Sequence, residues 1–319
     1  MAASLSQPET AAAALRAGQI VAFPTETVYG LGADARNPDA VARIFAIKGR
    51  PPGHPLIVHL ADASELSQWS NRIPESARRL ADHFWPGPLT LILPGSLAPS
   101  EVTGGQDSIG LRVPRHPVAQ ALLKAFRGGI AAPSANRFGR VSPTLAHHVR
   151  DELGAAVDVL LEGGACEVGL ESTILSLVEP TPKLLRHGAI TRSDMEAVLG
   201  RTIVLPGDEE TLRAPGLLAS HYAPLTPLQL MSTQALSTLR TAPSIKVAVL
   251  LIGEHPPPPR TLGYSMPADP KAYGNQLYAR LRALDQEDYD LIIAERPPAT
   301  EAWGAVLDRL TRASHQSSS

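Results

Sequence analysis

The chain has 319 residues, of which 44% are apolar and 19% are charged, and its formal net charge is −2 at pH 7. This length and apolar content suit two globular domains with ample core material. A nearly neutral chain carries no global basic field that would attract nucleic acid, which leaves only a local basic groove open.

The cysteine content and the N-terminal sequence restrict the cellular compartment. The single cysteine, Cys166, excludes an internal disulfide and a cysteine zinc cluster, and we expect it to be a small core residue. Residues 1–18 are rich in alanine and have neither the basic start of a signal peptide nor a long apolar run. We therefore predict a cytoplasmic protein without a membrane segment, beginning with a surface helix over residues 9–17.

Taken in chain order, the first 200 residues alternate short apolar runs, which predict strands, with amphipathic stretches, which predict helices. The predicted strands are 20–23, 56–60, 89–93, 109–114, 130–136, 157–161, 174–178 and 184–188. The predicted helices are 40–47, 63–69, 75–84, 117–126 and 144–153. Because some strands follow one another directly and others are separated by helices, we predict a mixed α/β sheet rather than a regular doubly wound one.

The composition and the apolar periodicity of the sequence change after residue 200. Residues 201–227 are rich in proline and glycine and weakly periodic, which is typical of a linker or a functional loop. Residues 245–253 then form a near-continuous apolar run, the pattern of a parallel strand covered on both faces. Helices at 272–284 and 300–312 lie on either side of a strand at 290–294, so we predict a smaller, Rossmann-like α/β domain without a glycine-rich nucleotide fingerprint. We expect the polar tail, 314–319, to be disordered.

The most distinctive stretch begins where the first strand ends, with the sequence PTETVYGLG at 24–32. Open α/β sheets usually bind their ligands at strand exits. The helix over residues 40–47 then ends in Lys48-Gly49-Arg50, which delivers two cations to one place. Cations, hydroxyls and glycines together suggest a phosphate site, although no Walker A sequence is present. Solvated charges on a turn are the simpler alternative.

Other polar residues stand where an apolar pattern is expected. Arg112 lies within an apolar strand, where a buried charge needs a partner and a carboxylate fits its planar fork. The alternative is an outward position on a half-exposed sheet. The strand at 130–136 ends in Ser134 and Asn136, whose small side chains would let a ligand lie against the backbone. Ser142-Pro143-Thr144 would open a helix, and helix N-termini favour anions.

Eight stretches, in this order, resemble the YrdC/YwlC family of threonylcarbamoyl-AMP synthases. They are PTETVYGLG, KGRPPGHPLIVH, WPGPLT, SIGLRVP, AAPSAN, SPT, GLESTI and LLRHG. The HYAP element at 221–224 and the second domain resemble the long, two-domain form of the family. The resemblance implies a twisted mixed sheet with a deep basic groove. It also implies a reaction in which L-threonine, bicarbonate and ATP give threonylcarbamoyl-AMP and pyrophosphate, for the t6A modification of tRNA.

The same matching assigns roles to single residues. The catalytic set would be Lys48, Arg50, Ser134 and Asn136. The ATP-binding set would be Arg50, His54, Ser108, Ser134, Ser142, Arg186 and Tyr222. The threonine-binding set would be Thr27, His59, Arg112, Ala132 (through its backbone) and Ser172. His54 departs from the family pattern, in which this position is often asparagine or another small polar residue.

The resemblance also divides the chain and names its partners. It implies a YrdC-like catalytic domain at 8–200 and a C-terminal α/β domain at 228–313, joined by a linker at 201–227. Because the mixed anhydride product hydrolyses easily, our hypothesis is that this linker closes as a lid and excludes water. Mg²⁺ would ride on the phosphates of ATP, since Glu26 and Glu171 are the nearest motif acids and form no carboxylate cluster. The further partners would be tRNA or the transferase that consumes the product.

Two other hypotheses stay open on the sequence. A basic concave surface would bind double-stranded RNA without chemistry, but this leaves Arg112 and the Ser134/Asn136 pair unexplained. A carbamoyl-adenylating enzyme with another acceptor would normally carry acylphosphatase and zinc-finger parts, which this sequence lacks.

Overall fold

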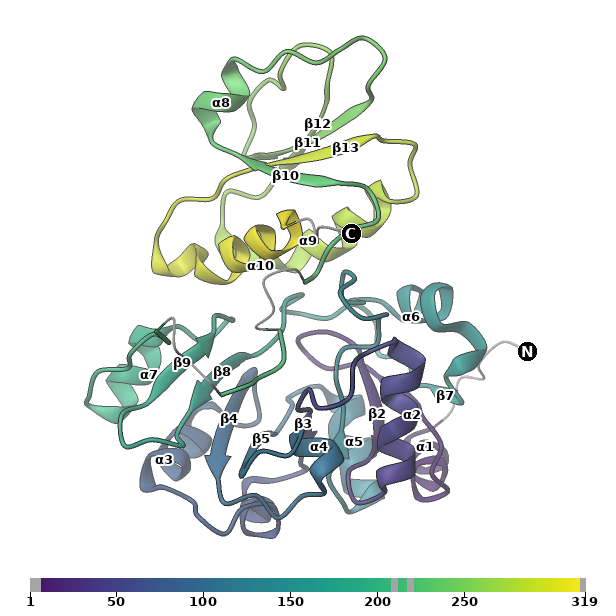
Figure 1. The fold of residues 1–319 in the computed structure, drawn as a ribbon, viewed down its shortest axis with the longest axis vertical. Coiled ribbons are helices and arrows are strands. Elements are labelled where there is room, and N and C mark those ends of the chain that lie inside the picture. The colour runs from purple at the N-terminus through teal and green to yellow at the C-terminus, as the bar shows by residue number, and fades with distance from the viewer. Residues whose placement is uncertain (1–6, 208–211, 217–220, 316–319) are drawn as a thin grey trace. The chain divides into compact units, whose positions relative to one another are not determined.

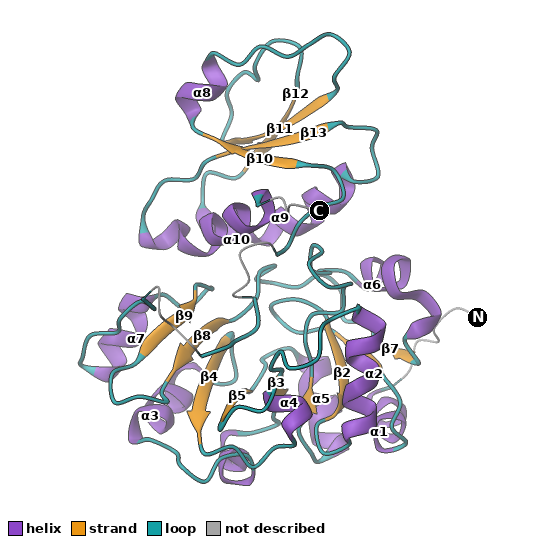
Figure 2. Ribbon diagram, in the orientation of Figure 1, coloured by secondary structure: helices purple, strands orange, loops and turns teal. Residues whose placement is uncertain are grey.

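The computed structural model describes residues 7–207, 212–216 and 221–315. They form two compact units, the first from Met1–Phe138 and Pro143–Leu217 and the second from Gly139–Ser142 and Leu218–Ser319. Each unit combines a sheet with helices, as Figure 1 and Figure 2 show. The four residues Gly139–Ser142 thus belong to the second unit, although the chain on either side of them belongs to the first.

The first unit is built on a mixed sheet whose nine described strands have the order β7-β1-β2-β6-β3-β5-β4-β8-β9. Pairs β1/β7, β3/β5 and β4/β8 are parallel and the other pairs are antiparallel. The predicted mixed α/β sheet is therefore confirmed. The strands are β1 (Val21–Phe23), β2 (Gly30–Asp34), β3 (Ile57–His59), β4 (Leu89–Pro94), β5 (Ser108–Arg112), β6 (Ile130–Ala131), β7 (Val159–Leu160), β8 (Thr173–Ser176) and β9 (Lys183–Arg186).

Helices cover both faces of this sheet at one end and one face at the other. Helices α1 (Pro8–Arg16) and α5 (Pro117–Phe126) pack on one face of β1 and β7, and α2 (Pro38–Lys48) and α6 (Ala146–Leu153) pack on the opposite face. Helices α3 (Glu75–Phe84) and α7 (Arg192–Leu199) cover one face of β4, β5 and β8. The shorter helical turns are η1 (Ala63–Gln68), α4 (Ser100–Thr103) and η2 (Gly154–Ala156).

The second face of β3, β4 and β8 carries Ile57, Ile92 and Ile174. In the part of the chain that the structure describes, these side chains pack with Leu185 and with the segment 212–214 instead of a helix. Register pairs Ile57 and Ile92 with Gly110 of β5. Because side chains alternate along a strand, His59, Thr90 and Arg112 project from this same face. The polar residues of the motifs therefore lie beside an apolar patch that a loop covers.

Strand β2 was not predicted, because Gly30 and Gly32 interrupt its apolar pattern. The glycines are needed for close packing. A Cβ at Gly32 would lie 2.8 Å from both Ile130 and the ring of Phe23. Real Cβ atoms essentially never approach so closely, and glycine alone lets the Phe23 ring lie against this strand.

The second unit is a four-stranded parallel sheet, in the order β10-β13-β11-β12 over its described residues. The predicted Rossmann-like α/β character is confirmed. Strand β11 is buried along almost its whole length, as its apolar run predicts, whereas the unpredicted β12 is largely exposed. Its elements are β10 (Leu228–Met231), α8 (Thr233–Ser237), β11 (Val247–Ile252), β12 (Leu262–Met266), α9 (Pro270–Leu284), β13 (Leu291–Glu295), η3 (Glu301–Trp303) and α10 (Gly304–Ser314).

Two smaller predictions can be compared with the structure. Cys166 is a buried core residue, as predicted. The helix predicted from residue 144 begins instead at Ala146, and the Thr144 N–H donates to His148 Nδ1 at 3.2 Å just before it. The helix start thus lies two residues later than predicted, and the anion binding predicted at 142–144 stays a prediction.

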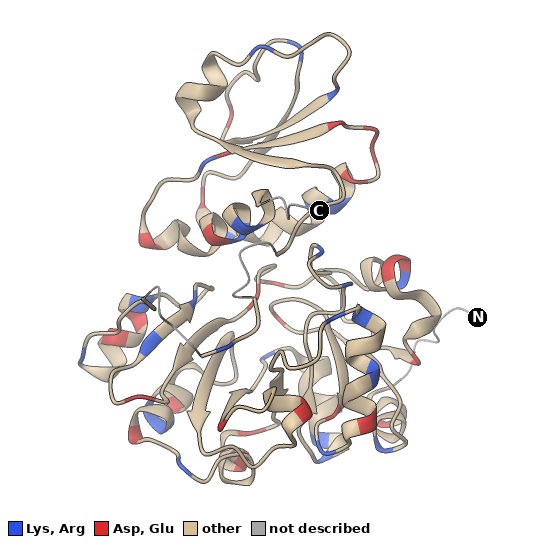
Figure 3. Cartoon of the chain, in the orientation of Figure 1, with Lys and Arg blue, Asp and Glu red and all other residues tan. Residues whose placement is uncertain are grey.

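The termini and the surface add three observations. The disordered tail was predicted at 314–319, but Ser314 is the last residue of helix α10, and residues 316–319 lie outside the described residues. No helix within the described ranges is long and apolar enough to cross a membrane. Figure 3 shows basic and acidic residues interspersed along both units.

Candidate active site

Arg112 ends β5 and is buried with an ionic partner from the loop after β1. Its Nη2 lies 2.8 Å from Glu26 Oε1, and only 5% and 2% of the two side chains are exposed. Its Nη1 donates to Thr27 Oγ1 at 2.9 Å, and its Nε donates to the Gly87 carbonyl at 3.3 Å. The carboxylate that Arg112 requires is thus the protein's own Glu26, a residue that was absent from the predicted site.

The loop that carries Glu26 and Thr27 is fixed by Thr25. Three hydrogen bonds form a chain through this loop. Arg112 donates to Thr27 Oγ1, which lies 2.8 Å from Thr25 Oγ1, and the Thr25 hydroxyl donates to the Val28 carbonyl at 2.6 Å. Because Thr25 uses its proton for this last bond, the Thr27 hydroxyl donates to Thr25. The same Thr25 oxygen accepts from the backbone N–H groups of Thr27 and Val28, each at 3.2 Å. Such side-chain-to-backbone bonds stabilise a turn, so this turn holds its shape without a ligand.

His59 ends β3 and pairs in register with Arg112. Burial, followed by the charge of Arg112, lowers the pKa of His59 from 6.5 to about 3, so the imidazole is neutral at pH 7. Its ring meets the Phe23 ring edge-on, with 5.9 Å between the centroids.

Three buried polar atoms at these strand ends have no hydrogen-bond partner among the described residues. They are His59 Nδ1, Glu26 Oε1 and Arg112 Nη2, the last two being in ionic contact without hydrogen-bond geometry. A buried polar atom left without a partner costs about 1–3 kcal/mol. These atoms lie in the loop after β1 and at the ends of β3 and β5, and together they indicate a place for a polar ligand.

A second polar group crosses β4, β8 and β9. Arg186, which ends β9, donates through Nε to the Ser172 carbonyl at 3.0 Å and through Nη2 to Ser172 Oγ at 3.1 Å. Ser172 Oγ in turn lies 2.7 Å from Thr90 Oγ1. The third guanidinium nitrogen of Arg186 donates to the Pro215 carbonyl at 3.1 Å. This arginine therefore joins the start of β8 to the segment 212–216.

Lys48, the last residue of α2, ties the predicted catalytic residues together. The Lys48 Nζ donates to the carbonyl of Ser134 at 2.6 Å and to that of Asn136. The Phe138 N–H donates to the backbone carbonyl of Lys48 at 2.8 Å. Burial, followed by the charge of Arg50, lowers the pKa of Lys48 from 10.5 to about 7. Lys48 thus fixes the backbone of the 134–136 stretch to the end of α2.

Arg50 and His54 complete this basic corner. Arg50 Nη2 donates to the Pro55 carbonyl at 3.0 Å, and its guanidinium carbon lies 5.9 Å from the centroid of the Phe138 ring. The His54 ring lies 5.8 Å from the same ring, centroid to centroid. Burial, Arg50 and Arg213 all lower the pKa of His54.

The remaining predicted residues of the first unit are placed by the sheet. Ser108 begins β5 and is buried, and it projects from the same face as Arg112. The Ala132 N–H donates to the Ile57 carbonyl at 3.0 Å, which fixes the backbone of Ala132 beside β3. The threonine-binding prediction rested partly on this backbone.

Ser142 and Tyr222 lie in the second unit. Ser142 belongs to its short segment Gly139–Ser142, and Arg282 of α9 donates to the Ser142 carbonyl at 3.4 Å. Tyr222 is buried with φ of 63°, a left-handed conformation that is uncommon for a non-glycine residue. Its ring stacks on Tyr278 at 5.9 Å and carries the guanidinium of Arg309 at 5.0 Å. Their predicted contacts with ATP stay predictions.

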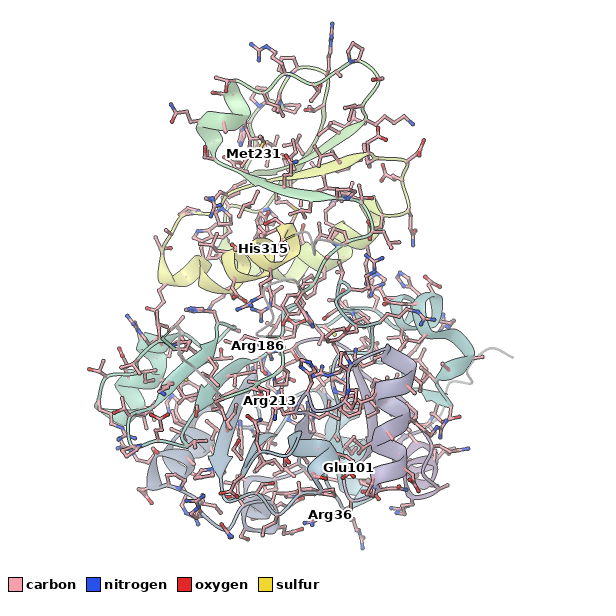
Figure 4. All side chains as sticks on the ribbon, in the orientation of Figure 1. Arg36, Glu101, Arg186, Arg213, Met231 and His315 are labelled. Atoms are coloured by element: carbon pink, nitrogen blue, oxygen red, sulfur yellow. The ribbon has the colours of Figure 1, made fainter. Side chains whose placement is uncertain are left out.

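The described part of the predicted lid, 212–216, is bound to the first unit. Arg213 donates to the carbonyls of Gly53 and Gly104 at 2.5 and 2.7 Å. Its backbone exchanges two hydrogen bonds with the side-chain amide of Gln106, at 2.9 and 3.1 Å. Figure 4 labels Arg186 and Arg213. The rest of the predicted lid at 208–211 and 217–220 lies outside the described residues.

The chemistry of the basic corner suits an anion better than a metal ion. Across the described ranges, no group of three His, Cys, Asp or Glu side chains could hold a metal ion. Lys48 and Arg50 bring two cations to this corner, and the carboxylates of Glu152 and Glu171 interact with Lys48 through their charge. A metal ion in this place would have to be brought by the ligand.

Two family models match the chain. Residues 13–188 match the Sua5/YciO/YrdC model, described as "Telomere recombination", and residues 190–315 match "Threonylcarbamoyl-AMP synthase, C-terminal domain". The chain belongs to the Sua5/YciO/YrdC family. The resemblance inferred from the eight motifs is confirmed, and so is the long, two-domain form.

Relatives of this family match over nearly the whole chain. The threonylcarbamoyl-AMP synthase of Bacillus subtilis is 42% identical over 95% of this chain and 91% of its own length. The synthase of Pyrococcus abyssi is 38% identical over 95% of this chain and 93% of its own length. The crystal structure of P. abyssi Sua5 complexed with L-threonine superposes with a TM-score of 0.88 at 36% identity, covering 96% of this chain and 94% of that one. Because these relatives are named as synthases and match nearly the whole chain, the chain is an enzyme.

Proposed function

We propose that the chain is an L-threonylcarbamoyladenylate synthase, a nucleotidyltransferase that converts L-threonine, bicarbonate and ATP into threonylcarbamoyl-AMP and pyrophosphate. The observation that carries the proposal is the set of buried polar atoms on Glu26, His59 and Arg112 that form no hydrogen bond with the described residues, together with the basic residues Lys48 and Arg50. The names of the relatives and the threonine complex of the archaeal structure support it.

The reaction needs positioning more than acid–base chemistry at phosphorus. The threonine amine and bicarbonate form a carbamate and water. One carbamate oxygen then attacks the α-phosphorus of ATP, and pyrophosphate leaves with the electrons of the broken P–O bond. A carbamate is already an anionic nucleophile, so this step requires no general base. Catalysis comes from alignment and from cations placed where negative charge develops.

The roles of the residues follow from the two substrates that must be aligned, ATP and the threonine carbamate. Lys48 holds the carbonyls of Ser134 and Asn136, and with Arg50 it supplies positive charge for the phosphates. The other nucleotide contacts are His54, Ser108, Ser142, Arg186 and Tyr222. Threonine binds at Thr27, His59, Arg112, Ser172 and the backbone of Ala132.

Magnesium enters this scheme with the nucleotide. The described residues offer no carboxylate cluster, so the metal fits here only as part of Mg·ATP, where it screens the phosphate oxygens. We place the enzyme in the cytoplasm, where its product would pass to the transferase that modifies tRNA.

The domain at 8–200 would carry the chemistry, and residues 201–227 would act as its lid. The mixed anhydride hydrolyses easily, so excluding water protects it. The bonds that Arg213 makes to Gly53 and Gly104 support a closed position for this segment.

The test is incubation with ATP, bicarbonate and L-threonine, followed by detection of pyrophosphate and the adenylate. Omitting threonine should abolish the adenylate. An enzyme that adenylates another carbamoylated acceptor would release pyrophosphate without threonine. An RNA-binding module would release none, and would bind double-stranded RNA with a steep salt dependence.

A further inference from the structure

The ion pair between Arg112 and Glu26 calls for an explanation other than stability. Removing two charges from water costs about as much as their attraction returns, so a buried ion pair is rarely favourable compared with apolar residues. In this pair the 2.8 Å contact lacks hydrogen-bond geometry, and both facing atoms keep unused bonding capacity. Such a pair is costly to keep unless something else binds to it.

An α-amino acid is complementary to this arrangement. Its carboxylate and ammonium groups are attached to one carbon, so it carries a short dipole. Laid antiparallel to the ion pair, its carboxylate meets Arg112 Nη2 and its ammonium meets Glu26 Oε1. The third unpartnered atom, His59 Nδ1, belongs to a residue in register with Arg112 and can bond to a side-chain hydroxyl. Three open atoms thus match the three polar groups of threonine.

We propose that Glu26 binds the α-ammonium group of the substrate and accepts one of its protons. This proposal rests on the proposed function, because it takes L-threonine as the substrate. The ammonium transfers H⁺ to the Glu26 carboxylate, giving a neutral amine and a carboxylic acid. The amine lone pair then forms the N–C bond to bicarbonate, and one C–O bond breaks. The leaving hydroxide takes the second amine proton, so the products are the carbamate and water. Glu26 returns its proton to solvent before the next cycle.

The surroundings of Glu26 suit this role. Its Oε2 accepts from the Arg115 N–H at 3.0 Å, which fixes the carboxylate and leaves Oε1 facing Arg112. The side chain of Arg115 pairs with Glu167 at the surface, at 2.8 Å. The Cys166 thiol interacts electrostatically with Glu26, and burial raises the pKa of this thiol to about 12, so it stays neutral. Arg112 is therefore the single charged side chain in contact with Glu26 among the described residues.

The decisive experiment crosses a protein change with a ligand change. Calorimetry measures binding of L-threonine and of (2S,3R)-2,3-dihydroxybutanoate, in which a hydroxyl replaces the ammonium, to the wild type and to Glu26→Gln. The wild type should prefer threonine by about 50-fold or more, and Glu26→Gln should reduce that preference at least tenfold, about 1.4 kcal/mol of coupling. Glu167→Gln is the matched control, because this side chain is 70% exposed. It should leave the preference unchanged.

Equal weakening of both ligands in Glu26→Gln would show that Glu26 only holds Arg112, and would overturn the proposal. The wild-type ratio needs no variant, so a protein that binds the hydroxy acid as well as threonine also overturns it, even if Glu26→Gln fails to fold. Neither measurement requires synthesis of the adenylate. Failure of the ammonium assignment is therefore distinguishable from failure of the proposed function.

The proton-transfer part has its own readout. The rate of adenylate formation by Glu26→Gln should fall about 100-fold at pH 7, within the range of general-base contributions. It should recover as the pH rises and free threonine loses its ammonium proton unaided. A deficit that stays constant with pH would contradict proton acceptance by Glu26.

Discussion

Binding of ATP should change the protonation of Lys48, and the size of this change follows from the structure. The pKa of Lys48 is lowered to about 7 by burial and by Arg50, so about nine-tenths of the side chain is neutral at pH 8. One phosphate charge at about 4 Å is worth about 4 kcal/mol at an effective dielectric constant of 20, enough to raise this pKa by about 3 units. Binding should then take up about 0.9 proton at pH 8 and about 0.1 at pH 6.

Calorimetry of a non-hydrolysable ATP analogue, in buffers of different ionisation enthalpy, measures this uptake. Lys48→Met should abolish the pH 8 component, and His54→Asn should keep it, because histidine titrates at lower pH. At Lys48 the folded state binds fewer protons than the unfolded chain between pH 7 and 10.5, so the contribution of this residue to stability becomes more favourable as the pH rises through this window. The stability difference between the wild type and Lys48→Met should therefore change with pH in the direction that favours the wild type. Equal uptake in wild type and Lys48→Met would refute the placement of the phosphates beside this lysine.

Three further predictions concern the ion pair, β2 and the lid. Arg112→Met should cost roughly 3–5 kcal/mol in urea unfolding, because it leaves Glu26 buried without its partner, and adding Glu26→Gln should recover part of that loss; strictly additive losses would contradict the coupling. Gly32→Ala should lower stability by about 1–3 kcal/mol, whereas Gly207→Ala, with no atom within 4 Å, should stay within about 0.5 kcal/mol; similar effects would argue against the close contact in β2. Arg213→Ala should lower the adenylate formed per pyrophosphate released with little change in melting temperature, and an unchanged yield would count against the lid.

Much of the first unit could be predicted because its strands are short, apolar and separated by clear turn signals. The basic end of α2 was predicted from the Lys48-Gly49-Arg50 sequence that follows an amphipathic stretch. Strand β2 was missed because its two glycines carry no apolar signal, although the close approach of Phe23 is the reason they are there. Strand β12 was missed because its exposed positions carry no alternation that a core would impose.

The site was predictable where one residue violates its local pattern. Arg112 in an apolar strand required a partner, and the structure supplies Glu26. The identity of that partner could not be read from the sequence, because Glu26 and Arg112 are brought together by the pairing of β1, β2, β6, β3 and β5 across the sheet. The motif position of Glu26, directly before Thr27, was the available signal, and it was interpreted only as a nearby acid. Lys48 was predicted as a phosphate cation, but its bonds to the carbonyls of Ser134 and Asn136 depend on tertiary packing.

The patch formed by Ile57, Ile92 and Ile174 under residues 212–214 has a consequence for handling and turnover. Any movement of residues 212–214 away from the sheet exposes these three isoleucine side chains to water, at a cost on the order of a few kcal/mol. Protein molecules with this patch exposed would then be scarce, roughly one in a hundred or fewer, and they would tend to associate through it. An apolar dye added during turnover should report how often each molecule exchanges its contents with the solvent.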